Sequence, residues 1–179
     1  MFKELILADF RERTRRYSFL ITLGFVLYFA YLVITGRYAL TLGDCRGVYN
    51  AAWTGSLMGT GSTLMLLMFG FYLVNNCIRR DRETGVGEIL TTTALSRTRY
   101  MLAKFVSNIL TLSALVAILM PAGLLMQVLF GVTTHFSLWA FLSPFLFLTL
   151  PIIVLISALA LLFESVRFLR STAGNVLYF

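Results

Sequence analysis

Four long runs without a charged side chain dominate the pattern of polar and apolar positions along the chain. They cover Tyr17 to Gly36, Gly47 to Ile78, Phe105 to Thr134 and Phe136 to Phe163. Each run reaches the roughly 20 residues that a helix needs to cross the hydrocarbon of a bilayer. Backbone groups in lipid must find partners within their own segment, and no alternation typical of a β-barrel strand is present. We therefore predict an all-α integral membrane protein with transmembrane helices at 17–36, 53–78, 105–131 and 137–163.

Residues 1–16 predict an interfacial amphipathic helix ahead of the first span. Apolar side chains fall on one side at helical spacing, and charged side chains fall on the other. The apolar side holds Phe2, Leu5, Ile6 and Phe10, and the polar side holds Glu4, Arg11, Glu12 and Arg15. We expect Arg13, Arg15 and Arg16 to reach anionic lipid head groups, at about 1 kcal/mol each. The alternative is a charge cluster that only sets the topology.

Composition supports a membrane protein, and the positive charges orient it. Hydrophobic residues make up 59% of the 179 residues, and the mean hydropathy of +0.85 excludes an ordinary soluble domain. Lys and Arg flanking short loops stay on the cytoplasmic side. Of the 15 Lys and Arg residues, Arg37 and Arg46 lie in the first connection and none lies in the third. The other thirteen lie before the first span, in the second connection or after the fourth span, which predicts that both termini are cytoplasmic. These are Lys3, Arg11, Arg13, Arg15, Arg16, Arg79, Arg80, Arg82, Arg97, Arg99, Lys104, Arg167 and Arg170. The simplest location is a prokaryotic plasma membrane.

Residues 164–179 follow the fourth predicted span and end in an apolar stretch from Asn175 to Phe179. We expect this segment to be the lead-in to a fifth helix that is missing from the chain, so that the chain is truncated after four spans. The alternative is a short hydrophobic tail that lies on the bilayer.

Small and polar residues within the spans suggest where helices touch. Gly55 and Gly59 lie four positions apart in the second span, a spacing that permits close helix approach. They favour helix packing, with a wall of a translocation path or a subunit contact as the alternative. Gln127 is the strongly polar side chain deep within the third span, and it faces either a partner helix or a substrate. The spans hold no charged residue, which argues against a proton pump, a voltage sensor or an ion-coupled carrier.

The connection between the second and third spans, residues 79–104, has a more ordered chemistry than a linker needs. It predicts two short helices with a break between them. Gly85 opens the first helix, and Ser96 stands at the N-cap position of the second. We call this segment the elbow. It either offers a charged ridge to a soluble partner or rests on lipid.

At the elbow the sequence resembles the permease subunits of ABC transporters of the ABC-2 type. The matching stretch runs from Asp81 to Arg97 and reads DRETGVGEILTTTALSR, followed by Tyr100 and Lys104. The family pattern has an acidic-basic pair, a glycine, a Glu-x-Leu step, a threonine, usually a proline, then Leu-Ser-Arg and a lysine. The sequence departs from this pattern at Ala94, where proline is usual.

The resemblance implies a unit with an N-terminal amphipathic helix and six transmembrane helices, of which this chain covers about two thirds. The elbow would be the coupling helix that docks on a cytosolic nucleotide-binding subunit. Six residues would shape or contact that docking surface, namely Glu83, Gly85, Glu88, Leu95, Ser96 and Arg97. The implied partners are an ABC ATPase subunit, a second permease subunit in a homo- or heterodimer, and membrane lipids, with no nucleic acid. The implied activity is export.

The chain has no glycine loop of Walker type, so ATP hydrolysis would belong to another polypeptide or to a missing segment. We therefore expect no enzyme activity, no cofactor and no metal in the chain itself. An intramembrane enzyme is a weaker alternative, because His135, Cys45 and Cys77 are far apart in the sequence. A membrane scaffold or assembly factor without transport is the other alternative. It explains the composition but not the pattern of the elbow.

Overall fold

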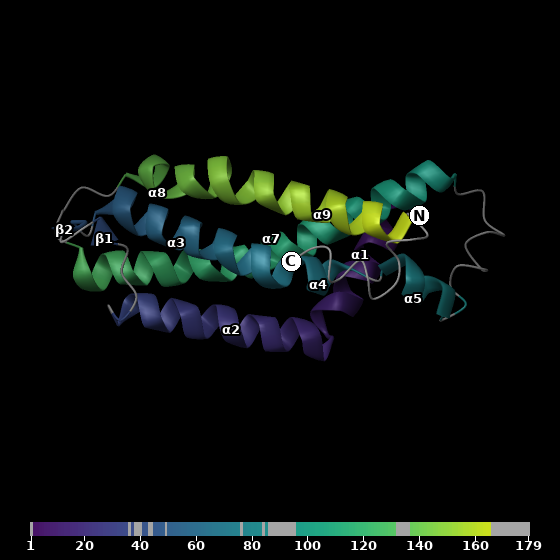
Figure 1. Cartoon of the computed structure of the whole chain (residues 1–179), viewed down its shortest axis with the longest axis horizontal. Coiled ribbons are helices and arrows are strands. Elements are labelled where there is room, and N and C mark those ends of the chain that lie inside the picture. Colours follow the sequence, from purple (N-terminus) through teal and green to yellow (C-terminus); the bar gives the residue numbers. More distant parts are fainter. Residues whose placement is uncertain are drawn as a thin grey trace.

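The computed structural model of the protein describes residues 2–35, 37, 41–42, 45–48, 50–75, 77–83, 85, 96–131 and 137–165. Long helices run side by side along one axis (Figure 1). They are α2 (Tyr17–Ile34), α3 (Ala51–Met65), α7 (Arg97–Phe130) and the pair α8 (Leu138–Pro144) and α9 (Leu150–Ser165). The short helices α1 (Phe2–Thr14) and α5 (Cys77–Glu83) lie at one end of this bundle.

Three helical stretches are long and apolar enough to cross a membrane, namely Ala51–Val74, Arg97–Leu129 and Leu138–Ser165. A fourth is counted only if α1 and α2, which are bent by 67°, form one span. Among the described residues we therefore find three to four candidate spans where the sequence predicts four. The first connection also contains two antiparallel strands of two residues each, β1 (Thr41–Leu42) and β2 (Cys45–Arg46), which leave the all-α class of the chain unchanged.

The second span is made of three helical pieces in continuous sequence. Asn50 caps α3, because its side chain accepts a hydrogen bond from the Trp53 N–H at 2.8 Å. A π-helical turn, η1 (Leu66–Gly70), and α4 (Phe71–Val74) follow. At Asn75 the backbone becomes extended, with ψ 161°. The helix therefore ends before 78, the boundary that the apolar pattern predicts, and the next residues belong to α5.

The third span begins earlier than the sequence predicts. Ser96 is the N-cap of α7, and its hydroxyl oxygen accepts from the Arg99 N–H at 3.4 Å, which confirms the predicted cap. From there one helix of 34 residues runs to Phe130. Residues 97–104, predicted as the second half of the elbow, are therefore the first turns of α7. No helix breaker separates these residues from the apolar run, so the helix continues through them.

The fourth span contains a second π-helical turn, η2 (Phe145–Thr149), between α8 and α9. Pro144 and Pro151 flank this turn, and each lacks the N–H that a regular α-helix would use. The span ends at Ser165, so Glu164, predicted to lie in the lead-in to a fifth helix, is part of α9. The rest of that lead-in, residues 166–179, lies outside the described residues.

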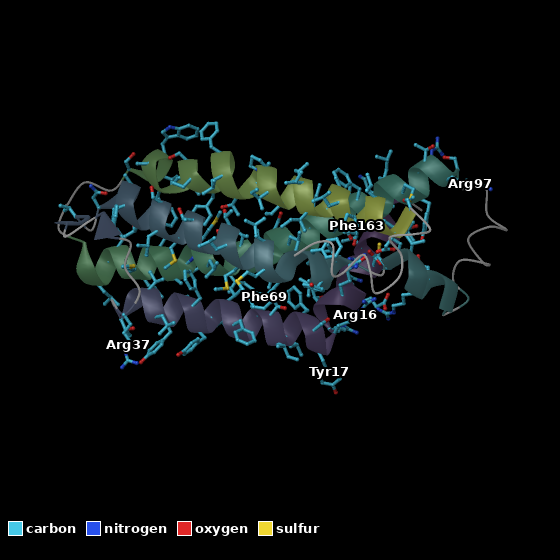
Figure 2. All side chains as sticks on the ribbon, viewed as in Figure 1. Arg16, Tyr17, Arg37, Phe69, Arg97 and Phe163 are labelled. Carbon is cyan, nitrogen blue, oxygen red and sulfur yellow. The ribbon has the colours of Figure 1, made fainter. Side chains whose placement is uncertain are left out.

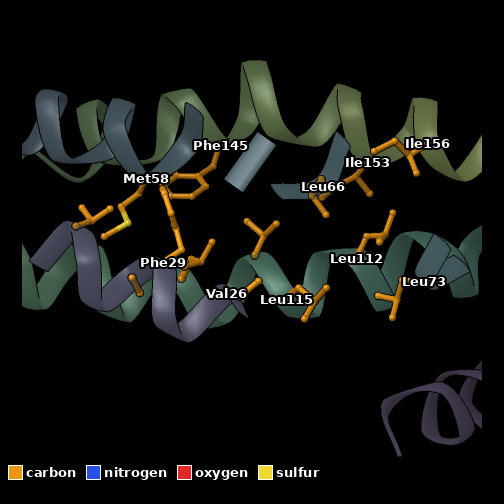
Figure 3. Packing of buried hydrophobic residues seen from close by; sticks show 14 of the residues in the cluster. Val26, Phe29, Met58, Leu66, Leu73, Leu112, Leu115, Phe145, Ile153 and Ile156 are labelled. Atoms are coloured by element: carbon orange, nitrogen blue, oxygen red, sulfur yellow. The ribbon is translucent and has the colours of Figure 1, made fainter. Parts of the chain in front are cut away.

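The core is apolar and involves all the long helices. Figure 3 shows side chains from α2, the second span, α7 and the fourth span meeting along the axis of the bundle. Large apolar side chains also point outward, among them Tyr17, Ile21, Tyr28, Val128, Trp139 and Phe147. A soluble monomer rarely exposes so much apolar surface, whereas a lipid-facing bundle requires it. The arrangement thus agrees with a membrane protein.

Candidate functional site

Buried ions gather at the end of the bundle where α1, α5, the start of α7 and the end of α9 meet. We call this region the charged end. Asp9 of α1 lies between two cations there. Its Oδ2 accepts from the Arg13 Nε at 2.9 Å, and its Oδ1 accepts from the Lys104 Nζ at 2.9 Å. The three residues are 8% exposed or less, so these pairs are shielded from water.

Lys104 also contacts a second carboxylate, on a different helix. Its Nζ lies 2.8 Å from Oδ2 of Asp81 in α5, and the Tyr100 hydroxyl donates to the same oxygen at 2.6 Å. The chain of contacts therefore alternates in charge from Arg13 through Asp9 and Lys104 to Asp81. Because every buried charge in it has an opposite neighbour, the cost of removing the charges from water is offset. Lys104 joins α1 and α5 to α7.

Glu164 connects the same region to α9. Its carboxylate accepts hydrogen bonds from the backbone N–H of Cys77, at 2.6 Å, and from the backbone N–H of Ile78. A carboxylate at this place satisfies N–H groups at the start of α5 that have no partner within the helix. α5 is thus attached to α9 at its first residues and to α7 at Asp81.

Half-exposed charges surround the buried group. Glu12 of α1 pairs with Arg16 at 3.4 Å and with Arg80 of α5. Arg16 and Glu12 are 30% and 45% exposed, so water screens this pair and it contributes much less than the buried contacts. The buried contacts through Lys104 therefore dominate the attachment of α1 and α5.

The electrostatic environment shifts two groups at the charged end that lie outside the three candidate spans. Burial raises the pKa of Asp9, but the charges of Arg13 and Lys104 outweigh it, so the pKa lies below its ordinary value of 3.8. Burial, together with the nearby Glu164 carboxylate, raises the pKa of the Cys77 thiol to about 12. Asp9 is therefore ionised and Cys77 is a neutral thiol at neutral pH.

The residues predicted to dock a partner are only partly within the described chain. Gly85 has the left-handed φ of +73°, which a glycine adopts without steric cost. Ser96, the N-cap of α7, and Arg97, its first residue, are exposed, and Figure 2 shows Arg97 at the charged end. Glu83 is the last residue of α5. The Glu83 side chain, Glu88 and Leu95 lie outside the described residues.

The small residues of α3 lie against the start of the fourth span. A Cβ atom at Gly55 would lie 2.5 Å from the carbonyl oxygen of Phe141, and one at Gly59 would lie 2.9 Å from Cβ of Pro144. Both distances are too short for real atoms, so only glycine permits this approach. In the structure these two positions pack α3 against α8.

Polar side chains join the spans at two further places. Gln127 of α7 accepts a hydrogen bond from the Thr54 hydroxyl at 3.2 Å, between α7 and α3. Farther along, the hydroxyl of Thr149, the last residue of η2, donates to the Gly59 carbonyl at 3.2 Å. Ser62 and Thr63 contact the same hydroxyl at 3.2 and 3.3 Å. Within the described chain, Gln127 therefore faces a partner helix.

Sequence reasoning missed the buried group and misplaced one of its members. Arg13, expected at lipid head groups, is 3% exposed and pairs with Asp9. The available signal was the spacing of Ile6, Asp9 and Arg13, which places all three on the buried face of α1. Among the described residues, no group of three His, Cys, Asp or Glu residues forms a metal site.

Comparisons with protein-family models, with curated proteins and with solved structures find no match for the chain.

Proposed function

We propose that the protein is a membrane-spanning permease subunit of an ATP-driven exporter of the ABC-2 type. In this proposal the elbow docks on a separate ATPase subunit, and a second permease subunit completes the pathway. The proposal combines the sequence pattern from Asp81 to Arg97 with the arrangement of the charged end. The chain supplies the membrane-spanning part and the partner supplies the energy of ATP.

The observation that carries the proposal is that the two ends of the elbow contact each other. Asp81, near the end of α5, contacts Tyr100 and Lys104, both in the first two turns of α7. The two ends of the intervening segment are thus held together by charge-assisted contacts. A force applied to the segment would move α5 and α7 as one body rather than stretch a loose linker.

Further contacts extend this body to other helices. Glu164 attaches the start of α5 to α9, and Asp9 attaches α1 to Lys104. A partner that binds the elbow more tightly in one arrangement of the bundle would shift the equilibrium toward that arrangement. The exposed Arg97 and Arg99 of the elbow favour a partner with an acidic docking surface.

Coexpression of the full-length protein with any ABC ATPase that is encoded beside it tests the proposal. We expect the ATPase to copurify and its hydrolysis to be stimulated. Charge reversal by Arg97→Glu should reduce the copurified ATPase at least about tenfold, because the change opposes charge complementarity. Glu88→Lys should uncouple hydrolysis from transport. Unchanged transport and unchanged stimulation in both variants would contradict the proposal.

The matched control is Arg37→Glu, since Arg37 is exposed at the opposite end of the bundle (Figure 2). This variant should keep wild-type copurification. If Arg37→Glu and Arg97→Glu lowered copurification equally, net charge rather than docking would explain the loss. An ATPase that binds but is neither stimulated nor coupled to transport would favour the scaffold instead.

A further inference from the structure

A buried polar side chain without a hydrogen-bond partner among the described residues lies in α7, one helical turn after Lys104 and farther from the charged end. Asn108 of α7 is 0% exposed, and within the described part of the chain neither its Oδ1 nor its Nδ2 has a hydrogen-bond partner. Positions four apart share a helix face, so Asn108 follows Lys104 directly on the buried face of α7. On α9, which packs against α7, the buried Ser157 hydroxyl also lacks a partner among the described residues.

The packing one helical turn farther along α7, around Leu112, places the Asn108 amide at the seam between α7 and α9. A methyl group at Gly70 would lie 3.4 Å from Leu112 Cδ2 and 3.5 Å from Ile156 Cδ1, so α7 and α9 meet beside η1. The two helices are antiparallel, because α7 begins and α9 ends at the charged end (Figure 1). One turn from Leu112 toward that end lies Asn108, and the next turn holds Lys104 and its ion pairs.

The packing of this seam is unfavourable for Asn108 in its present arrangement. Burying an amide without a hydrogen bond costs free energy relative to leaving it in water. A state in which water reaches Asn108 recovers that free energy. The contacts of Lys104 with Asp9 and Asp81 oppose such a state, because they hold α1 and α5 over this end of the seam.

We propose that Lys104, bound to Asp9 and Asp81, is a latch that closes an entrance at the charged end, and that opening it brings water to Asn108. The entrance lies between α7 on one side and α1 and α5 on the other. Asn108 acts as the group whose hydration stabilises the open state. The latch would gate access to the pathway of the proposed exporter, but its opening is a property of this chain alone.

Cys77 is a native reporter of this opening. It begins α5 and is 3% exposed, and its backbone N–H is held by Glu164. Its raised pKa keeps the thiol protonated while it is buried. Because maleimides react with the accessible thiolate, separation of α5 from α7 and α9 would increase the labelling rate in two ways, through exposure and through a more ordinary pKa.

The experiment measures maleimide labelling of Cys77 in the purified full-length protein, with Cys45 replaced by Ser so that one cysteine remains among residues 1–179. Asp81→Asn removes one latch carboxylate without changing its shape, and we expect labelling at least about tenfold faster. Asn108→Leu removes the group that favours opening, and we expect labelling at least about threefold slower. The rate of global unfolding is measured for each variant by circular dichroism.

The matched control for Asp81→Asn is Glu12→Gln, which changes a half-exposed carboxylate between α1 and α5. Its labelling rate should stay within about twofold of wild type, because exposed pairs are weak. An unchanged rate in Asp81→Asn, or a faster rate in Asn108→Leu, would overturn the latch. So would labelling no faster than the rate of global unfolding in every variant, since the thiol would then be exposed by unfolding alone. The ATPase partner is absent from this experiment, so its outcome is independent of the docking proposal.

Discussion

Lys104 Nζ lies 2.9 Å from Asp9 Oδ1, although 95 positions separate the two residues in the sequence. This contact joins an N-terminal helix to the first turns of a long apolar helix. The same ammonium group reaches Asp81 at 2.8 Å, so one cation serves carboxylates from two helices. The stability of the charged end therefore depends on Lys104 more than on any of the half-exposed charges around it.

Lys104→Met should lower the free energy of unfolding by about 3–5 kcal/mol, because it leaves two buried carboxylates without their shared cation. Chemical denaturation in detergent micelles measures this change. Arg97→Met, on the same helix but exposed, should stay within about 0.5 kcal/mol of wild type. Equal stability of wild type and Lys104→Met would show that the buried ion pairs make no net contribution to the free energy of unfolding.

The stability contributed by Asp9 should disappear in acid. The pKa of Asp9 lies below 3.8 in the folded state, because Arg13 and Lys104 outweigh the effect of burial. A carboxyl with a lowered pKa stabilises the fold above its unfolded-state pKa and loses this contribution as the pH falls through its folded-state pKa. Asp9→Asn should therefore be less stable than wild type by a constant amount from about pH 7 to about pH 5.

Below 3.8, the ordinary pKa of Asp9, the difference between wild type and Asp9→Asn should shrink, since wild type loses the contribution that the variant already lacks. Unfolding curves at a series of pH values measure both stabilities. Glu12→Gln, at a carboxylate that is 45% exposed, is the control and should track wild type. If the stability difference between wild type and Asp9→Asn stayed constant into strong acid, the loss of stability in acid would not come from Asp9.

Gly55→Ala should destabilise the protein by about 1–3 kcal/mol, because the new methyl group must displace packed atoms. Its Cβ would lie 2.5 Å from the Phe141 carbonyl oxygen, on the backbone of α8. Gly24→Ala, on α2 with nothing within 4 Å of its Cβ position, is the matched control. The control should be neutral or stabilising by up to about 1 kcal/mol, since alanine favours helix. Similar effects at both positions would argue against tight packing of α3 on α8.

Thr149→Val should cost about 1 kcal/mol, within the range measured for polar contacts between membrane helices. The change keeps the shape of the side chain but removes its donor to the Gly59 carbonyl and its contacts with Ser62 and Thr63. Thr22→Val on α2 serves as the control, because the Thr22 hydroxyl donates to the Ser18 carbonyl of its own helix and has no bond to another helix among the described residues. If both variants lost the same stability, the contact between α3 and η2 would have no special role.

Some parts of the candidate site were predictable from sequence because their causes are local. Ser96 caps α7 through a residue three positions away, and the glycines of α3 indicated close packing through their spacing. The sequence does not show that the helix capped by Ser96 runs without a break into the apolar run from Phe105, because the charged residues 97–104 resemble a surface segment. Arg13 was misplaced because an amphipathic pattern directs every charge outward.

The sequence by itself determined that this protein is built from apolar helices, since long uncharged runs can satisfy their backbone groups in lipid only by coiling within each segment. Only the tertiary structure decided that Asp9, Lys104 and Asp81 are buried together and that Glu164 attaches α9 to α5. A charge is stable away from water only beside an opposite charge, and that depends on the meeting of helices distant in the chain.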